Sequence, residues 1–347
     1  SLDRILVQTT FRLEKPTLDI RDYSHDEAFG TLAQAQLPTQ DFTIYDPFTY
    51  TVKWGDTLGS ISQKFGFSLQ KIMSANAQIL DPNKIRVGQV INIPARDNYI
   101  LNQLDLDFCT GFTASELNNA IWGIKSDPLY QFSKIKQIRG EYKTYGATLR
   151  DGAMSLIKYG SLPSVYAPYT HNGSMGDKTR DFLADWSNWP NGLDSQARKQ
   201  RDLSFFTVDG KNDIFDNIRS ALYIHRNERR GVSFGVFWHY EWTHAPGGII
   251  PDEMPTTNIG GGHNIAIVGQ KTINGKMYLV FQNSWGENAG DNGFYYFPRS
   301  IVDQIYQLGY GAFTFSKIDK SGFTGSGNLL TLIATFINKL LGKICMD

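Results

Sequence analysis

Apolar residues recur along the chain at two spacings, which predict helices in its first two thirds and strands in the remainder. Three- and four-residue steps predict a helix that starts near Cys109 and runs to Ile121, and further helices over 148–159 and 213–226. Short runs rich in β-branched and aromatic residues then predict four strands: 233–239, 264–269, 277–282 and 293–297. Helices followed by strands indicate an α+β fold whose two parts pack as lobes.

A smaller pattern of strand, helix, helix and strand occupies residues 50–95. After a strand-like start, Asp56 or Thr57 is the expected N-cap of a helix whose apolar residues fall at helical spacing. Ser68 is the expected N-cap of a second helix, and residues 87–94 read as the closing strand. The order β-α-α-β within fewer than fifty residues predicts a compact module.

The two ends of the chain have weaker patterns. Residues 1–49, with a short strand over 5–7 and a short helix over 26–35, read as an arm that packs on a neighbouring domain or docks on a larger assembly. The Gly- and Ser-rich residues 318–328 predict a flexible linker, and an apolar stripe over 329–345 predicts an amphipathic helix that packs on its own chain or on an assembly partner. We therefore divide the chain into four parts: 1–49, 50–95, 96–317 and 318–347.

Composition narrows the class of protein. Hydrophobic residues make up 41% and charged residues 20% of the 347 residues, an ordinary globular balance that argues against disorder over most of the chain. With 34 basic and 34 acidic residues the net charge is zero, so the chain lacks the basic excess that is typical of nucleic-acid-binding proteins. No apolar run reaches the ~18 residues that span a bilayer, and the first ten residues lack the apolar core of a secretory signal. We expect neither a metal ion nor a cofactor.

Two cysteines and one histidine stand out by their context. Two free thiols, Cys109 and Cys345, are a better interpretation than a disulfide between mid-chain and tail. Cys109 should lie at a helix N-terminus, where the partial positive charge lowers the pKa of a thiol. His263 follows three glycines, 260–262, which predict a tight or mobile loop, and a buried strand begins after it. A histidine at the mouth of a strand is well placed to face a cleft.

Residues 50–95 resemble a LysM module. The segment YTVKWGDTLGSISQKFGFSLQKIMSANAQ, followed by IRVGQVINIP, is similar to that family along its length. The resemblance implies binding of N-acetylglucosamine chains, such as peptidoglycan, between the loop after the first strand and the turn around 79–84. The residues expected to line this groove are Gly55, Asp56, Thr57, Leu58, Ile79 and Asn83. The alternative is a module retained for structure, because its first turn requires a glycine and an aspartate whether or not sugar binds.

The segment from about residue 100 to about residue 317 resembles the papain-like cysteine peptidases, with two lobes, one helical and one an antiparallel, barrel-like sheet. The most specific match is the motif Asn283-Ser-Trp285-Gly. In that family the asparagine accepts a hydrogen bond from the catalytic histidine, and the tryptophan shields this bond from water. The resemblance therefore implies Cys109 as nucleophile, His263 as its base and Asn283 as the residue that orients the base.

The same resemblance implies further site residues. Gln103, six residues before Cys109, has the spacing of the glutamine whose amide contributes to the oxyanion hole in this family. The residues expected to contact substrate are Trp285, Gly262 and Pro163. Two other histidines, His239 and His244, are the nearest competitors for the role of base.

The sequence departs from the family immediately before the nucleophile. Asp107 and Phe108 stand where small residues are usual; a negative charge there would raise the pKa of the thiol, and a phenylalanine would crowd the substrate. Two hypotheses follow. The first is a cysteine peptidase targeted by its LysM module to the bacterial cell wall, in an extracellular, envelope or virion setting, such as a virion- or tail-associated lytic enzyme. The alternative is a structural or adaptor component of a phage tail or injection assembly with a degenerate peptidase domain.

Overall fold

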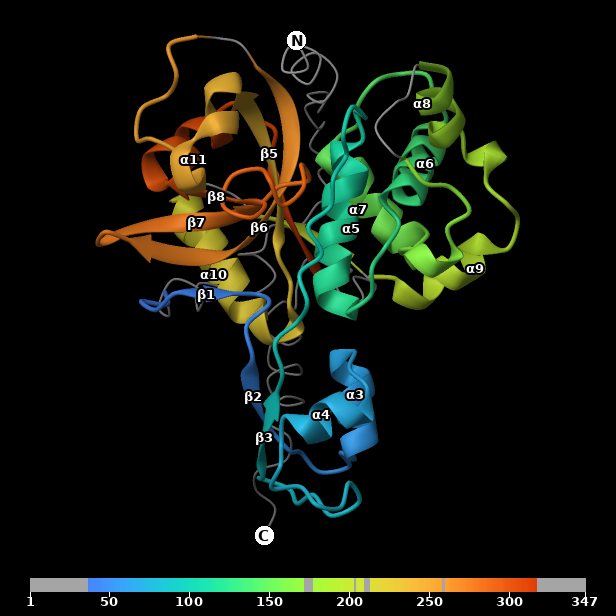
Figure 1. The fold of residues 1–347 in the computed structure, drawn as a ribbon, viewed down its shortest axis with the longest axis vertical. Coiled ribbons are helices and arrows are strands. Elements are labelled where there is room, and N and C mark those ends of the chain that lie inside the picture. Colours follow the sequence, from blue (N-terminus) through green and yellow to red (C-terminus); the bar gives the residue numbers. More distant parts are fainter. Residues whose placement is uncertain (1–36, 172–176, 203, 209–212, 258–259, 317–347) are drawn as a thin grey trace, which may run out of the picture.

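The computed structural model describes residues 37–171, 177–202, 204–208, 213–257 and 260–316. A sheet-containing lobe and a helical lobe lie side by side, and a small module lies below both (Figure 1). The strand expected over 5–7, the helix expected over 26–35, the linker and the amphipathic tail lie outside the described residues. None of the described helices is long and apolar enough to cross a membrane.

The small module has the expected order: β2 (Phe48–Thr51), α3 (Leu58–Phe65), α4 (Leu69–Ser74) and β3 (Val90–Ile93). Thr57 caps α3 in a capping box with Ser60, and Ser68 caps α4 by accepting from Lys71 N–H. The closing strand starts later than expected because Gly88, at φ +84°, turns the chain just before it. Apolar side chains of the two strands and two helices form a core of their own.

The helical lobe is built around α5 (Cys109–Trp122), α6 (Pro128–Arg139) and α7 (Leu149–Lys158), with α8 (Asp177–Ala184) and α9 (Leu193–Ala197) outside them. Almost every residue of α5 is buried, because one side packs on the sheet lobe and the other on the helical lobe. The sequence did not predict α6. Its buried residues include polar side chains such as Gln131, Ser133 and Lys136, so it has no amphipathic stripe to detect.

The sheet lobe contains an antiparallel sheet with the strand order β4-β9-β5-β6-β7-β8 among the described residues. Its strands are β4 (Ser204–Thr207), β5 (Val232–His239), β6 (Gly260–Ile273), β7 (Lys276–Gln282), β8 (Phe294–Pro298) and β9 (Ala312–Ser316). Two helices, α10 (Ile214–His225) and α11 (Arg299–Tyr306), pack against it. The longest strand, β6, lies at the centre and also contacts α5.

The three glycines 260–262 form the first part of β6, which corrects the expectation of a loop. They pair with residues 237–239 of β5. A Cβ on Gly260 would overlap the backbone oxygen of Trp238, so a glycine allows the two strands to approach here. His263 therefore lies inside a strand and not at the mouth of one, and it pairs with Val236 of β5.

Residues 37–49 join the small module to the sheet lobe. They contribute β1 (Phe42–Thr43), which pairs with Gly269 and Gln270 of β6, beyond the point where the pairing of β5 with β6 ends. The Pro38 carbonyl accepts from Arg219 and from Gln270, so this segment is bound to the sheet by side chains as well. The described part of the arm thus packs on its own chain.

The small module is docked on the rest of the protein by two buried arginines. Arg96 donates to Ala120 O of α5 at 3.1 Å and to Gly66 O at 2.9 Å, and its guanidinium lies 4.2 Å from the ring centre of Phe67. Arg229 donates to Ile44 O and to Pro94 O, at 2.8 and 2.7 Å. Backbone carbonyls from both sides therefore share the same two cations, which couples the module firmly to the lobes.

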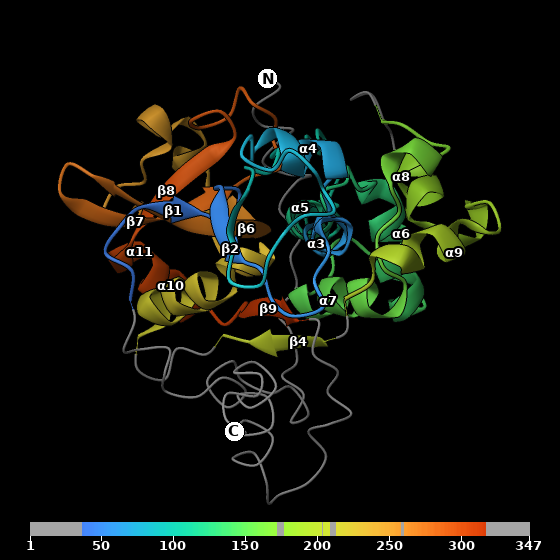
Figure 2. The ribbon, with the colours of Figure 1, turned by 90° about the horizontal axis from the view of Figure 1, so that it is seen from below.

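The C-terminal ends of α3 and α5 abut. Gly66, the C-cap of α3, is so close to α5 that a Cβ there would lie 2.7 Å from Trp122 O. Seen from the side and from below, the two helices lie roughly end to end (Figures 1 and 2). Their N-termini, at Cys109 and Leu58, therefore point away from each other.

Candidate active site

Cys109 is the first residue of α5 and is fully buried at the seam between the two lobes. Thr113, one turn later, donates to Asn264 O at 2.9 Å, which holds this end of α5 against β6. Burial raises the pKa of the Cys109 thiol to about 11, and the Asp107 charge adds to this; hydrogen bonds from Asn264 N–H and Thr110 oppose it. This reverses the shift expected from the helix N-terminus, because burial outweighs the nearby donors.

His263 and Asn283 are joined by a hydrogen bond between ring Nε2 and side-chain Oδ1, at 2.9 Å. The same Oδ1 accepts from Ser284 N–H at 2.8 Å, so it faces the ring as an acceptor and fixes the proton on Nε2. Burial lowers the pKa of His263 to about 4, although the bond to Asn283 partly offsets this. At neutral pH the imidazole is therefore neutral, with its basic lone pair on Nδ1.

Two tryptophans enclose His263. The Trp285 ring stacks on the imidazole with centroids 5.1 Å apart and an angle of 26° between the planes. The Trp238 ring meets the imidazole edge-on, with centroids 5.9 Å apart. Trp285 is in the place where a ring can keep water from the bond between His263 and Asn283.

Gln103 links the segment before Cys109 to the segment after Asn283. Its backbone N–H donates to Ser284 O at 2.8 Å, and Ser284 Oγ donates to its side-chain Oε1 at 2.7 Å. Its amide Nε2 donates to Leu106 O at 2.8 Å, and that amide carries a second N–H. Gln103 is thus buried and held at both ends of its amide, as a fixed hydrogen-bond donor must be.

The two unusual residues before Cys109 have partners in the helical lobe. Phe108 is fully buried and stacks on Phe132 in the helical lobe, with ring centres 3.9 Å apart. Its bulk therefore fills the core of that lobe and does not crowd the site. The Asp107 carboxylate is bound by the Arg180 guanidinium, so the negative charge that the sequence placed beside Cys109 has a cationic partner.

The residues expected to contact substrate are placed differently. Gly262 is buried in β6 next to His263, and Trp285 is half-buried over the imidazole. Pro163 forms an isolated bridge with Ser126, just before α6, and is therefore held beside that helix. The structure thus brings Gly262 and Trp285 together with His263, and it places Pro163 in the helical lobe, paired with Ser126.

Several of the residues expected to bind glycan have other roles in the small module. Asp56 accepts from Tyr50 OH and Lys53 N–H, and Thr57 caps α3, so both side chains are engaged in the turn. The Leu58 and Ile79 side chains belong to the core of the module, so these two residues could contact a sugar only with their backbone atoms.

Other residues of the module do face solvent where the groove was expected. Gly55 and Asn83 are exposed, and so are two apolar side chains that the sequence analysis missed, Trp54 and Leu80, each 91% exposed. The sequence did contain a signal: a tryptophan, Trp54, directly before the Gly55 turn. The turn itself does not require an aromatic residue at that position.

An acid-stability prediction follows from the buried imidazole. In the unfolded chain His263 binds a proton below its ordinary pKa of 6.5, whereas in the folded chain it binds one only near pH 4. The contribution to folding is thus present above pH 6.5 and lost as the pH falls toward 4, by about 3 kcal/mol in total. Urea unfolding of wild type and His263→Gln at pH 7.5 and 4.5 measures it. The variant should lose less stability on acidification; an equal loss contradicts the prediction.

Comparisons with known proteins match both parts of the chain. Residues 100–308 match the family described as papain family cysteine protease, and residues 50–94 match the LysM domain. The secreted LysM effector ECP6 of Passalora fulva is 44% identical over 57 residues, which are 16% of this chain and 25% of that protein. The probable cysteine protease RDL2 of Arabidopsis thaliana is 36% identical over 71 residues, 20% of this chain and 19% of that protein.

Longer matches come from one curated relative and one solved structure. The N-acetylmuramoyl-L-alanine amidase XlyB of Bacillus subtilis (strain 168) is 31% identical over 123 residues, 35% of each chain, so at most about a third of any of these three relatives is matched. The structure of xylellain, a cysteine protease from Xylella fastidiosa, covers 89% of this chain and 97% of its own with a TM-score of 0.61. At 17% identity this likeness concerns the fold, and it confirms the two-lobed α+β prediction.

Proposed function

Because the chain belongs to the papain family of cysteine proteases, we propose that it hydrolyses peptide bonds with Cys109 as nucleophile and His263 as base. The observation that carries the proposal is the hydrogen bond of 2.9 Å between His263 and Asn283 beneath Trp285. It leaves Nδ1 as the basic nitrogen of a neutral ring. Asn264, the next residue, donates its N–H to the Cys109 thiol, which places the thiol beside this part of β6.

The reaction follows from these positions. His263 Nδ1 takes the thiol proton, and the thiolate attacks the substrate carbonyl carbon. The second Gln103 amide N–H and the Cys109 backbone N–H donate to the oxyanion that forms. The amine leaves with the proton from His263, and water then releases the acyl group by the same route.

Burial favours the neutral thiol of Cys109 and the neutral imidazole of His263, with pKa values of about 11 and about 4. Both shifts share burial as their largest cause, so exposing the seam to solvent or substrate dipoles moves the two values toward each other.

The direct test compares wild type with Cys109→Ala on purified peptidoglycan and on a mixture of peptides, with products read by mass spectrometry. New peptide termini should appear with wild type and be absent with the variant. Because the substitution removes only the sulfur from a buried position, circular dichroism should show both proteins folded. Equal products from both would refute the role of Cys109.

The LysM module supports a second part of the proposal, binding of N-acetylglucosamine glycan at a cell wall, outside the cell. The exposed Trp54 ring, beside the Gly55 turn, offers the flat apolar face that sugar rings pack against. One matched relative is named as a secreted LysM effector, and another as an N-acetylmuramoyl-L-alanine amidase. The peptidase would then act on peptides or proteins at the wall. The hypothesis of a virion component came from residues 1–49, the C-terminal tail and the altered residues before Cys109. Residues 1–36 and the tail lie outside the described residues.

Removing the Trp54 ring should weaken glycan binding about tenfold, since burying an exposed aromatic face contributes a kcal/mol or more. Co-sedimentation of the full chain with purified peptidoglycan measures this for Trp54→Ala, and Trp54→Phe should retain most of the binding. The control is Tyr166→Ala, which removes an exposed aromatic ring from the helical lobe. Undiminished sedimentation of Trp54→Ala would leave the module without this contact.

A further inference from the structure

We propose that Arg180, on α8, is a positioning residue for the nucleophile: it holds the Asp107 carboxylate, two residues before Cys109, and compensates its charge. The inference rests on the proposed role of Cys109 and goes beyond it, because Arg180 lies 71 residues later in the chain and touches none of the three residues of the proposed triad in any described hydrogen bond.

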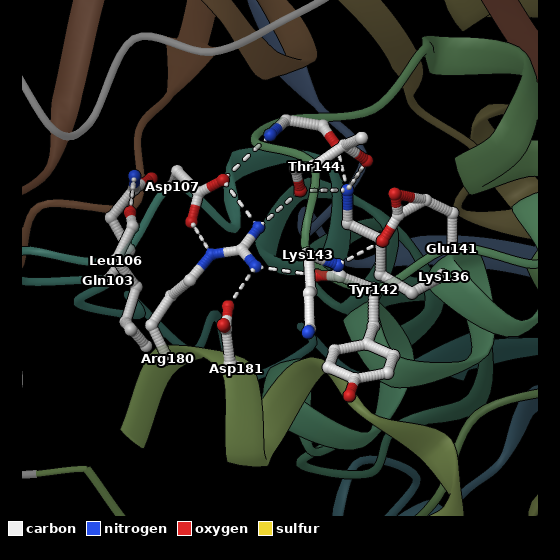
Figure 3. Close-up of polar contacts among 11 residues, drawn as sticks. Gln103, Leu106, Asp107, Lys136, Glu141, Tyr142, Lys143, Thr144, Arg180 and Asp181 are labelled. Atoms are coloured by element: carbon white, nitrogen blue, oxygen red, sulfur yellow. Dashed lines mark hydrogen bonds and ion pairs between the residues drawn. The ribbon is translucent and has the colours of Figure 1, made fainter. Parts of the chain in front are cut away.

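The Arg180 guanidinium binds Asp107 through two nitrogens (Figure 3). Nε lies 2.9 Å from Asp107 Oδ1, and Nη2 lies 3.1 Å from Oδ2. Both side chains are nearly inaccessible, with relative exposures of 6% and 2%. A bidentate pair at this depth fixes the orientation of the carboxylate as well as its position.

Of the remaining donors of Arg180, one N–H of Nη1 binds Asp181 Oδ1 at 2.9 Å, and two others bind the loop that begins after α6. Nη1 donates to Tyr142 O and Nη2 to Thr144 O, both at 2.6 Å, and Gly146 N–H donates to Asp107 Oδ2 at 2.7 Å. From the other side the buried Lys136 ammonium donates to Thr144 O at 2.7 Å. Asp107 is therefore the anion that ties the nucleophile segment to the 142–146 loop, and Arg180 is bound to both (Figure 3).

The same short turn carries the proposed oxyanion donor. Leu106, adjacent to Asp107, accepts from the Gln103 side chain at 2.8 Å, and its N–H donates to Gln103 O at 3.0 Å. Leu104, inside this turn, has φ +52°, a conformation that a leucine adopts only when its surroundings impose it. Displacing Asp107 would therefore disturb Gln103 and Cys109 together.

The charge of Asp107 makes Arg180 necessary for reactivity as well as geometry. The carboxylate raises the pKa of Cys109 even with its partner in place. The other charged groups that contact this cluster are Asp181, a second carboxylate bound by Arg180 at 2.9 Å, and Lys136 from α6, which donates to Thr144 O. The titratable group proposed as base for the thiol is His263 from β6. Asp105, also in the turn, pairs with His171 at 2.7 Å. Removing Arg180 would leave the charge nearest the thiolate without its direct partner.

The experiment follows alkylation of Cys109 by iodoacetamide from pH 6 to 10, read by peptide mass spectrometry so that Cys345 is scored separately. Arg180→Gln should displace the profile to higher pH, with alkylation at pH 8 slowed about fivefold or more, and should lower kcat with little change in KM. Asp107→Asn should displace the profile to lower pH. Adding Asp107→Asn to Arg180→Gln should bring the profile back toward wild type. Arg180→Lys keeps the positive charge but loses the bidentate fork, so its profile should lie between those of wild type and Arg180→Gln.

A purely structural role of Arg180 predicts a different result: Arg180→Gln would have a lower thermal midpoint, but its alkylation profile would not move. A folded Arg180→Gln with the profile and kcat of wild type overturns the proposal. Arg139→Gln is the control, since it breaks an ion pair to Asp151, 3.0 Å long, in the same lobe. If Arg180→Gln does not fold, an unmoved profile in Asp107→Asn overturns the electrostatic part. Full activity of Cys109→Ala would refute the peptidase role alone, because alkylation of Cys109 needs no turnover.

Discussion

Substituting alanine for His263 is expected to lower kcat/KM for peptide hydrolysis by about a thousandfold, because the thiol of Cys109 then has no base. Burial holds that thiol protonated, with a pKa of about 11, so water cannot replace the imidazole at neutral pH. Asn283→Ala should cost less, about ten- to a hundredfold, because it removes the bond that orients the ring and leaves the ring itself.

The order of these two effects tests the assignment. His239→Ala is the matched control: this histidine lies on β5, is buried and bonds to Thr257 O at 3.2 Å. It should keep nearly all of the kcat/KM of the wild type. Steady-state kinetics on one peptide substrate identified by mass spectrometry measure these effects. A larger loss of kcat/KM with His239→Ala than with His263→Ala would show that His263 is not the base.

Gly123→Ala is expected to destabilise the protein by several kcal/mol, whereas Gly140→Ala should cost about 1 kcal/mol. The two glycines are matched: each is the C-cap of a helix, at φ +69° and +72°. Only Gly123 lies at the contact with the LysM module, where a Cβ would overlap the Arg96 guanidinium and lie 2.8 Å from Gly66 O. A Cβ on Gly140 meets nothing within 4 Å.

Urea unfolding followed by circular dichroism measures the difference between the two variants. Subtracting the Gly140→Ala loss removes the backbone strain, so the remainder reports the cost of separating α5 from the module. Equal losses for the two variants would mean that the module is not held against α5 in solution.

Local rules made much of the fold predictable from the sequence. Thr57 and Ser68 cap helices where their types and positions suggested, and the motif around Asn283 led to a histidine that does bond to it. These features depend on neighbours in sequence or on a short motif. The two-lobed architecture followed because helices and strands are segregated along the chain.

What escaped prediction depends on contacts between distant segments. Nothing near Arg180 indicates that it binds Asp107, because the pairing arises only when α8 packs beside the nucleophile turn. Burial, the largest cause of the raised pKa of Cys109, escaped prediction for the same reason: the helix N-terminus and Asp107 are visible in the sequence, but full burial is not. The glycines before His263 suggested a loop, although they serve close approach of β6 to β5.

The end-to-end contact of α3 and α5 sets the distance between the proposed glycan-binding turn and the proposed nucleophile. At 1.5 Å per residue, the 14 residues of α5 and the 8 residues of α3 separate Cys109 from the Gly55 turn by about 30 Å. A flexible tether would let the nucleophile fold back onto the anchoring sugar, but a docked module does not. If Trp54 holds the wall glycan as proposed, the site at Cys109 would therefore act on a neighbouring strand or on a protein standing off the wall, and would spare the peptide next to its own anchor.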